Sequence, residues 1–200
     1  TLRDARPSPN VFAVVMATGI LSIGADRLGY LGLSDALGVL ASVGLVVLIA
    51  LVIATAVAER RVRVWDLSDP DVTLRLFTFV AACAVLHTRL EHHPIGVRVL
   101  GVLAVTAWTA LTALTIRNMA VRSWPALRDQ AHGAWLLASV GASGLVIAIA
   151  QLVGSTGQRG WLVAAVPIWL AALAEYLLMA WLILWRTAHE RNNPDGFVPD

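Results

Sequence analysis

Residues 9–25 read PNVFAVVMATGILSIGA. From Val11 to Ala25 the stretch is uncharged, and a helix rising 1.5 Å per residue would cross most of a hydrocarbon core of about 30 Å. Asn10, which follows Pro9, is expected to cap the start of this helix. Small residues recur along it: Ala13, Ala17, Thr18, Gly19, Ser22 and Gly24. Such residues let membrane helices pack closely, which is their more common role, and they also leave room for a passage.

The composition indicates an integral membrane protein. Of the 200 residues, 58% are hydrophobic and 14% are charged, and the mean hydropathy is +0.74. A soluble domain of this size could not cover so much apolar surface, so a helical membrane protein is predicted. The net charge of +2 is too small and scattered to suggest a nucleic-acid partner, and the single cysteine, Cys83, excludes an internal disulfide. All fifteen basic residues are arginine, which with the excess of alanine and valine favours a bacterial origin.

The chain is predicted to be one all-α transmembrane domain, 1–200, with six spans. The expected spans are 10–25, 37–58, 74–90, 96–116, 132–153 and 161–185. Their short links favour three antiparallel hairpins. The first, third and fifth spans are rich in small residues, whereas the second and fourth are richer in valine and leucine, so we expect odd helices inside and even helices outside. The third span is preceded by Ser68-Asp69-Pro70-Asp71, a helix-start signal.

The arginines predict the orientation. With six spans, eleven of the fifteen lie on the side that holds both termini. The positive-inside rule therefore places both ends in the cytoplasm, in a multi-pass protein of the inner (plasma) membrane. Four tryptophans fall near predicted span ends, as interfacial aromatic residues do: Trp65, Trp124, Trp161 and Trp185.

Five stretches carry a resemblance to a known family. They are VMATGILSI within the first span, LFTFVAA at 76–82, HGAWLLASV at 132–140, LILWR at 182–186 and NPDGFVP at 193–199. In order and spacing they resemble the tellurite-resistance/dicarboxylate transporter (TDT) family, to which the plant slow anion channels are related.

The resemblance implies a voltage-dependent anion channel/TehA-like bundle, in which five hairpins surround a pore lined by odd helices. Members often form trimers, each protomer with its own pore, and they pass chloride, nitrate, sulfite, malate and other C4-dicarboxylates, with tellurite resistance as a phenotype. The family has ten helices, so this chain is expected to be a fragment of a longer protein or a shortened member. The phenylalanine that gates the family's pore lies on the ninth helix, so no residue here takes that role.

The candidate pore-lining residues lie on odd spans: Phe12, Met16, Gly19, Phe79 and Trp135. Core packing is the alternative for each aromatic residue. Phe77 and Phe79 are two residues apart and cannot share one helix face, so at most one of them points inward. The expected partners are membrane lipid and a small anion, without a cofactor, a metal or a catalytic residue.

Two ionisable residues are further candidates. Glu175 lies in the middle of the sixth span, where a carboxylate costs about 2.5–3.5 kcal/mol on insertion scales and must face protein or water or be protonated. It is interpreted either as a proton-coupling group or as a protonated carboxyl bonded to a neighbouring helix. His132 is the first residue of the fifth span. It is interpreted either as a group that attracts anions when protonated or as an ordinary interfacial residue at a helix end. His92 and His93 lie in a short loop with Glu91 as the only acid beside them, and the lack of cysteines or carboxylate pairs favours a solvated loop over a metal site.

Two other functions compete with transport. One is a six-helix membrane scaffold or assembly subunit without transport of its own. The other, more remote, is an intramembrane serine protease, because Gly141-Ala142-Ser143-Gly144 matches the G-x-S-G of rhomboid proteases. A serine nucleophile needs a histidine base on a facing helix, and the sixth span contains none.

Overall fold

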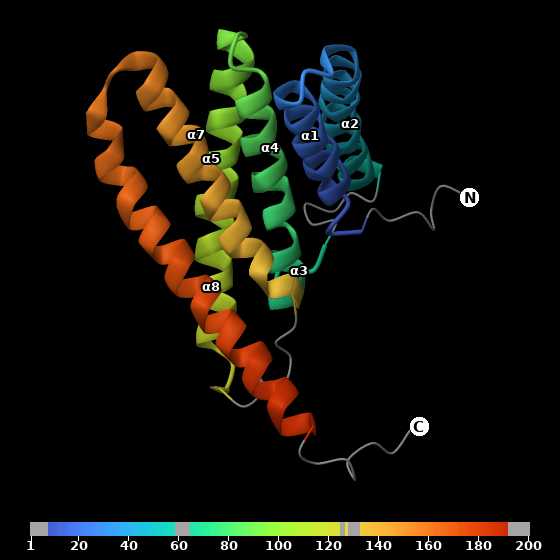
Figure 1. The fold of residues 1–200 in the computed structure, drawn as a ribbon. Coiled ribbons are helices and arrows are strands. Elements are labelled where there is room, and N and C mark those ends of the chain that lie inside the picture. The colour runs from blue at the N-terminus through green and yellow to red at the C-terminus, as the bar shows by residue number, and fades with distance from the viewer. Residues whose placement is uncertain (1–7, 59–64, 125–126, 128–132, 192–200) are drawn as a thin grey trace.

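The computed structural model describes residues 8–58, 65–124, 127 and 133–191. Every regular element within these ranges is helical (Figure 1). The elements are α1 (Phe12–Arg27), α2 (Leu31–Ala58), α3 (Pro70–Arg75), α4 (Phe77–Arg89), α5 (Pro94–Ala120), the 3-10 turn η2 (Gly133–Leu136), α7 (Leu137–Thr156), the 3-10 turn η3 (Arg159–Trp161) and α8 (Leu162–Arg191).

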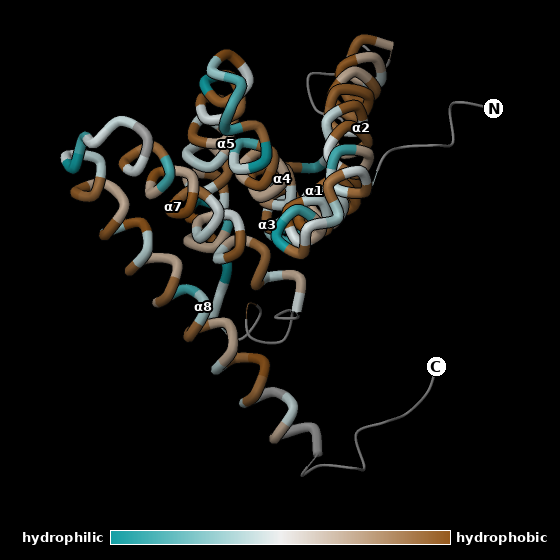
Figure 2. The backbone as a smooth tube through the Cα atoms, turned by 45° about the horizontal axis from the view of Figure 1, so that its top comes forward, coloured by the Kyte–Doolittle hydropathy of each residue, from teal (hydrophilic) through white to brown (hydrophobic). Residues whose placement is uncertain are grey.

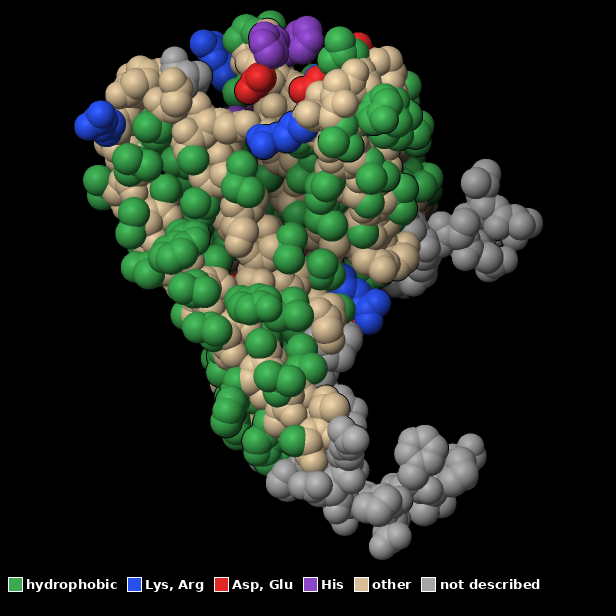
Figure 3. All heavy atoms as spheres, in the orientation of Figure 1, with side chains coloured by type: hydrophobic (Ala, Val, Ile, Leu, Met, Phe, Trp, Pro, Cys, Tyr) green, Lys and Arg blue, Asp and Glu red, His purple; other side chains and the backbone are tan. Residues whose placement is uncertain are grey.

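Among the described residues, five helical stretches are long and apolar enough to cross a membrane: Leu31–Ala58, Pro70–Arg89, Pro94–Ala120, Gly133–Gly154 and Arg159–Trp185. The helix of the first predicted span, α1, has 16 residues and is shorter than these five. Hydrophobic residues predominate along the helices (Figure 2). Acidic, histidine and several arginine side chains lie at one end of the molecule, above a wide belt of hydrophobic side chains, and a further arginine patch lies below this belt (Figure 3). The predicted all-α membrane bundle is thereby confirmed.

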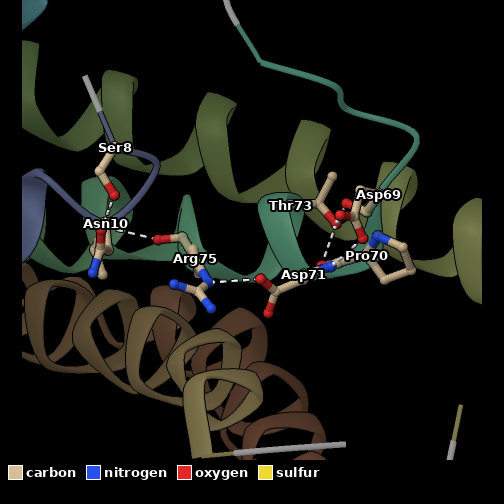
Figure 4. A network of polar contacts seen from close by, with 8 residues as sticks. Ser8, Asn10, Asp69, Pro70, Asp71, Thr73 and Arg75 are labelled. Atoms are coloured by element: carbon tan, nitrogen blue, oxygen red, sulfur yellow. Dashed lines mark hydrogen bonds and ion pairs between the residues drawn. The ribbon is translucent and has the colours of Figure 1, made fainter. Parts of the chain in front are cut away.

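The structure corrects several predicted boundaries. Helix α2 begins at Leu31, six residues before the predicted start, and so includes Asp35. The third and fifth spans each start with a separate short element, α3 and η2, before the main helix. The predicted cap of α1 is wrong: Val11 is the N-cap and has no side-chain bond, while Asn10 Oδ1 accepts a hydrogen bond from the Ser8 hydroxyl (Figure 4).

The predicted helix start at residues 68–71 is confirmed. The side chain of Asp69 caps α3 by accepting a hydrogen bond from the backbone N–H of Asp71 at 3.0 Å, and Pro70 occupies the first turn (Figure 4). One turn later, Arg75 Nε lies 2.7 Å from Asp71 Oδ2. The charge of Arg75 is therefore balanced within α3.

The third span forms the centre of the bundle. The most apolar window of Pro70–Arg89 is 67% buried, against 17% for Leu31–Ala58 and 22% for Pro94–Ala120. Helix α4 contacts α1, α5 and α7. In addition, α1 contacts α2, and α7 contacts α8. The small buried residues of α4, among them Ala81, Ala82 and Ala84, permit neighbours on several sides.

Two glycines bring the neighbours of α4 unusually close. A Cβ on Gly19 of α1 would lie 2.7 Å from Val85 Cγ1, and one on Gly144 of α7 would lie 2.9 Å from Ala84 Cβ. Both separations are shorter than van der Waals contact. The spacing of α1, α4 and α7 therefore depends on the missing side chains at these positions.

Candidate functional site

A cavity of about 580 Å³ lies between α1, α4, α7 and α8. Its wall is made of small or apolar residues with a few hydroxyls and one cation. The lining residues are Met16, Ile20, Ile23, Arg27, Ala81, Ala84, Val85, Thr88, Ser139, Val140, Ser143, Gly144, Ile147, Trp169, Ala172, Leu173 and Tyr176. The helices of the first, third and fifth predicted spans thus meet at one hollow, and the sixth span closes part of it.

Two of the four hydroxyl groups among the described lining residues donate to the backbone. Ser139 Oγ donates to the carbonyl of Leu136 at 2.7 Å, and Thr88 Oγ1 donates to the carbonyl of Ala84 at 3.1 Å. These two hydroxyl protons are therefore not available to a solute in the cavity.

Among the described residues that line the cavity, Arg27 is the only one that carries a formal charge. It is the last residue of α1 and is exposed. Along α1, the lining residues Met16, Ile20, Ile23 and Arg27 follow one another at spacings of four, three and four. They therefore share one helix face, and the arginine stands where that face reaches the end of the helix.

The family model described as SLAC1, voltage-dependent anion channel, matches residues 6–200. The chain belongs to the SLAC1 family. The predicted resemblance to the related transporter family is confirmed, and the family is one of membrane-embedded anion channels and transporters. The chain matched no curated protein and no solved structure in the same comparisons.

Within this SLAC1-family fold, the five predicted pore residues do not gather at one place. Met16 lines the cavity, and Gly19 lies against Val85, which also lines it. Trp135 is 1% exposed, in η2. Phe12 and Phe79 pack edge to face, with ring centroids 4.9 Å apart and planes at 68°. Both line a different hollow, to which α2 and α5 also contribute side chains.

Phe77 and Phe79 point to different neighbours. Phe77 is 2% exposed and lies against α7, where a Cβ on Gly141 would be 3.1 Å from its ring. Phe79 instead contacts Phe12 of α1.

The remaining candidates are placed less centrally. Glu175 is half-buried on α8, beside the lining residue Tyr176 and one turn from Ala172, but it is not part of the cavity wall. His132 lies outside the described residues. Ser143 lines the cavity, whose wall contains no histidine, so the described lining offers no base for a protease. No group of three metal-ligating side chains occurs in the part of the chain that was described.

A polar network beside the cavity escaped the sequence analysis. Arg89, at the end of α4, donates through Nε to Ser22 Oγ at 2.9 Å and through Nη2 to Asp35 Oδ1 at 2.6 Å. Ser22 Oγ in turn donates to the carbonyl of Ser34 at 2.7 Å. Arg89 therefore joins α4 to both α1 and α2. Asp35 and Arg89 are separated by 54 residues, so only the fold pairs them.

We expect Arg89→Met to loosen this junction. The change keeps an unbranched side chain but removes a charged donor to the buried Ser22, and hydrogen bonds to charged groups contribute about 1.5–3 kcal/mol. The exposed Asp35 contact adds little. Thermal unfolding in detergent should show a midpoint lowered by several degrees. The control is Arg98→Met, an exposed arginine of α5; equal midpoints for the two variants would contradict the structural role of Arg89.

Proposed function

We propose that the cavity between α1, α4, α7 and α8 forms part of the path by which a small anion crosses the membrane. The observation that carries the proposal is the cavity itself, lined by all three odd spans, with Arg27 as the single charge among its described lining residues. Membership of the SLAC1 family supports anion transport in general. The path through this particular hollow is our inference from its lining.

In this mechanism the small side chains leave the cavity wide enough for an anion, and Arg27 attracts the anion by its positive charge. An arginine at the end of a low-dielectric hollow raises the local concentration of anions without holding them deeply. Passage is passive or linked to protons, and it needs neither a cofactor nor covalent chemistry. Pore-lining roles are proposed for Met16 and, at the helix contact that sets the width, for Gly19.

The finer assignments follow the family resemblance. We propose a small inorganic anion, sulfite, a C4-dicarboxylate or a tellurite-related oxyanion as the solute. We further propose a homotrimer in a bacterial inner membrane, with both ends of this chain in the cytoplasm. Eleven arginines on that side support the orientation.

The test is flux in proteoliposomes made from the full-length gene product. Chloride, nitrate, sulfite, malate and tellurite should be compared with protein-free vesicles. We expect at least one anion to cross well above the background. If none of the five anions crosses above the background, the transport proposal fails and the competing scaffold function is favoured.

We predict that Glu175→Gln alters the pH dependence of flux. A carboxylate one turn from the cavity wall repels anions when ionised and not when protonated, so parent flux should rise as the pH falls. The glutamine variant should then be faster than the parent at neutral pH and show a flatter profile. Flux across a pH series measures this, with Glu91→Gln in an exposed loop as the control. An unchanged profile would exclude proton coupling through Glu175.

A further inference from the structure

A second hollow, which we call the outer groove, lies between α2 and α5, two helices that are mostly exposed. Its volume is about 450 Å³, and each of its described lining residues is hydrophobic. The lining residues are Phe12, Ile49, Val52, Ile53, Ala56, Trp65, Leu67, Leu76, Phe79, Ala107, Ala110, Leu111 and Leu114. Helices α2 and α5 stand apart on the same side of α1 and α4 (Figure 2). The Phe12–Phe79 pair contributes α1 and α4 side chains to the hollow.

The outer groove leads toward a cation. Ala110 and Leu114 of α5 line it, and Arg117 is seven and three residues further along the same helix, so it continues the same face one turn beyond the last lining residue. Arg117 is exposed, and its Nη2 lies 3.4 Å from Asn118 Oδ1. Asn118 Nδ2 donates at 2.7 Å to the carbonyl of Leu67, itself a lining residue. The arginine is thus tied to the end of the groove.

This combination restricts what can fill the groove. Among the described lining residues water would find no charged, hydroxyl or amide side chain, and apolar hollows of this kind exclude water. The α5 lining runs from Ala107 to Leu114, which corresponds to about 10 Å of helix. An apolar slot of that length in the hydrocarbon region fits part of an acyl chain, and an arginine beyond its end fits a phosphate. Trp65, among the lining residues, is of the residue type enriched at the membrane–water interface.

We propose that the outer groove binds one acyl chain of an anionic phospholipid, with the lipid phosphate at Arg117. The site is separate from the anion path, because none of its lining residues belongs to the cavity between α1, α4, α7 and α8. The lipid supplies the packing that the gap between α2 and α5 lacks.

Native mass spectrometry of the full-length protein in mild detergent tests the proposal. Phosphatidylglycerol and phosphatidylcholine are added separately, and the fraction of protein with one retained lipid is measured. We expect the parent to retain phosphatidylglycerol several-fold more than phosphatidylcholine. Arg117→Gln should reduce that preference to near equality, and Arg117→Lys should keep most of it. Ala110→Trp, which fills the groove, should reduce retention of both lipids.

Matched variants separate the groove from the general surface. Arg98→Gln removes an exposed arginine near the other end of α5, and Val105→Trp places an indole on an exposed position of α5 outside the groove, so both should retain lipid as the parent does. A preference for phosphatidylglycerol that survives Arg117→Gln would overturn the proposal. So would an Ala110→Trp variant that keeps its lipid but loses its oligomeric state, because a second copy of the chain would then be the occupant. If Ala110→Trp does not fold, the exposed Arg117→Gln variant decides alone.

Discussion

Replacing Ser143 with tryptophan is expected to lower anion flux by about tenfold or more, because the indole would obstruct a narrow path. Ser143 lies on α7, lines the cavity and is exposed within the monomer, so the larger side chain has hollow space to enter rather than packed core. Flux of the best-transported anion in proteoliposomes measures the effect. The variant should elute and show helical circular dichroism as the parent does.

The matched control is Val102→Trp. Val102 is 66% exposed on α5 and lines neither the cavity nor the outer groove. A tryptophan there adds the same bulk to the membrane-facing surface, and flux should stay near that of the parent. A folded Ser143→Trp variant with parental flux would mean that the anion does not pass through this cavity.

The second large effect is expected from Arg27→Glu. Arg27 is the one charged residue in the described part of the cavity wall, and reversing its charge replaces attraction of the anion by repulsion, so flux should fall several-fold at low ionic strength. Arg27 is exposed, so salt should weaken the effect as the Debye length shortens to about 8 Å near physiological ionic strength. Arg27→Gln should give an intermediate flux. Initial rates in a salt series distinguish the three proteins.

Arg98→Glu controls for the charge of the surface as a whole. Arg98 is exposed near the start of α5 and does not line the cavity. The same loss of flux in both glutamate variants would assign the attraction to the general field. A loss confined to Arg27→Glu would assign it to the cavity mouth.

Features that depend on neighbouring residues in the sequence were predictable. The uncharged runs predicted the helical membrane class. Asp69-Pro70 predicted the start of α3, because a capping side chain bonds to the backbone of the turn that it begins. The start of α2 was missed for the opposite reason. Asp35 reads as part of a polar link, yet the helix includes it, and its charge is paired with Arg89 from a distant helix.

The candidate site was predictable only in part, because knowing which spans are inner does not fix how each helix is rotated. Phe12 and Phe79 were predicted for the pore since they lie on odd spans, but they pack against each other at the outer groove. The face of α1 that reaches the cavity carries a signal, the sequence of Met16, Ile20, Ile23 and Arg27. Whether this face lines a cavity depends on which helices lie opposite it, and only the tertiary structure shows that.

The third span is tethered near both of its ends. The segment that leads into α3 is bonded to α5 through Leu67 and Asn118, and the end of α4 is bonded to α1 and α2 through Arg89. A piston-like displacement of α4 along the membrane normal would have to break both tethers together. In the proposed anion path, we therefore expect any widening of the cavity to come from the helices that surround α4 and not from a shift of α4 itself.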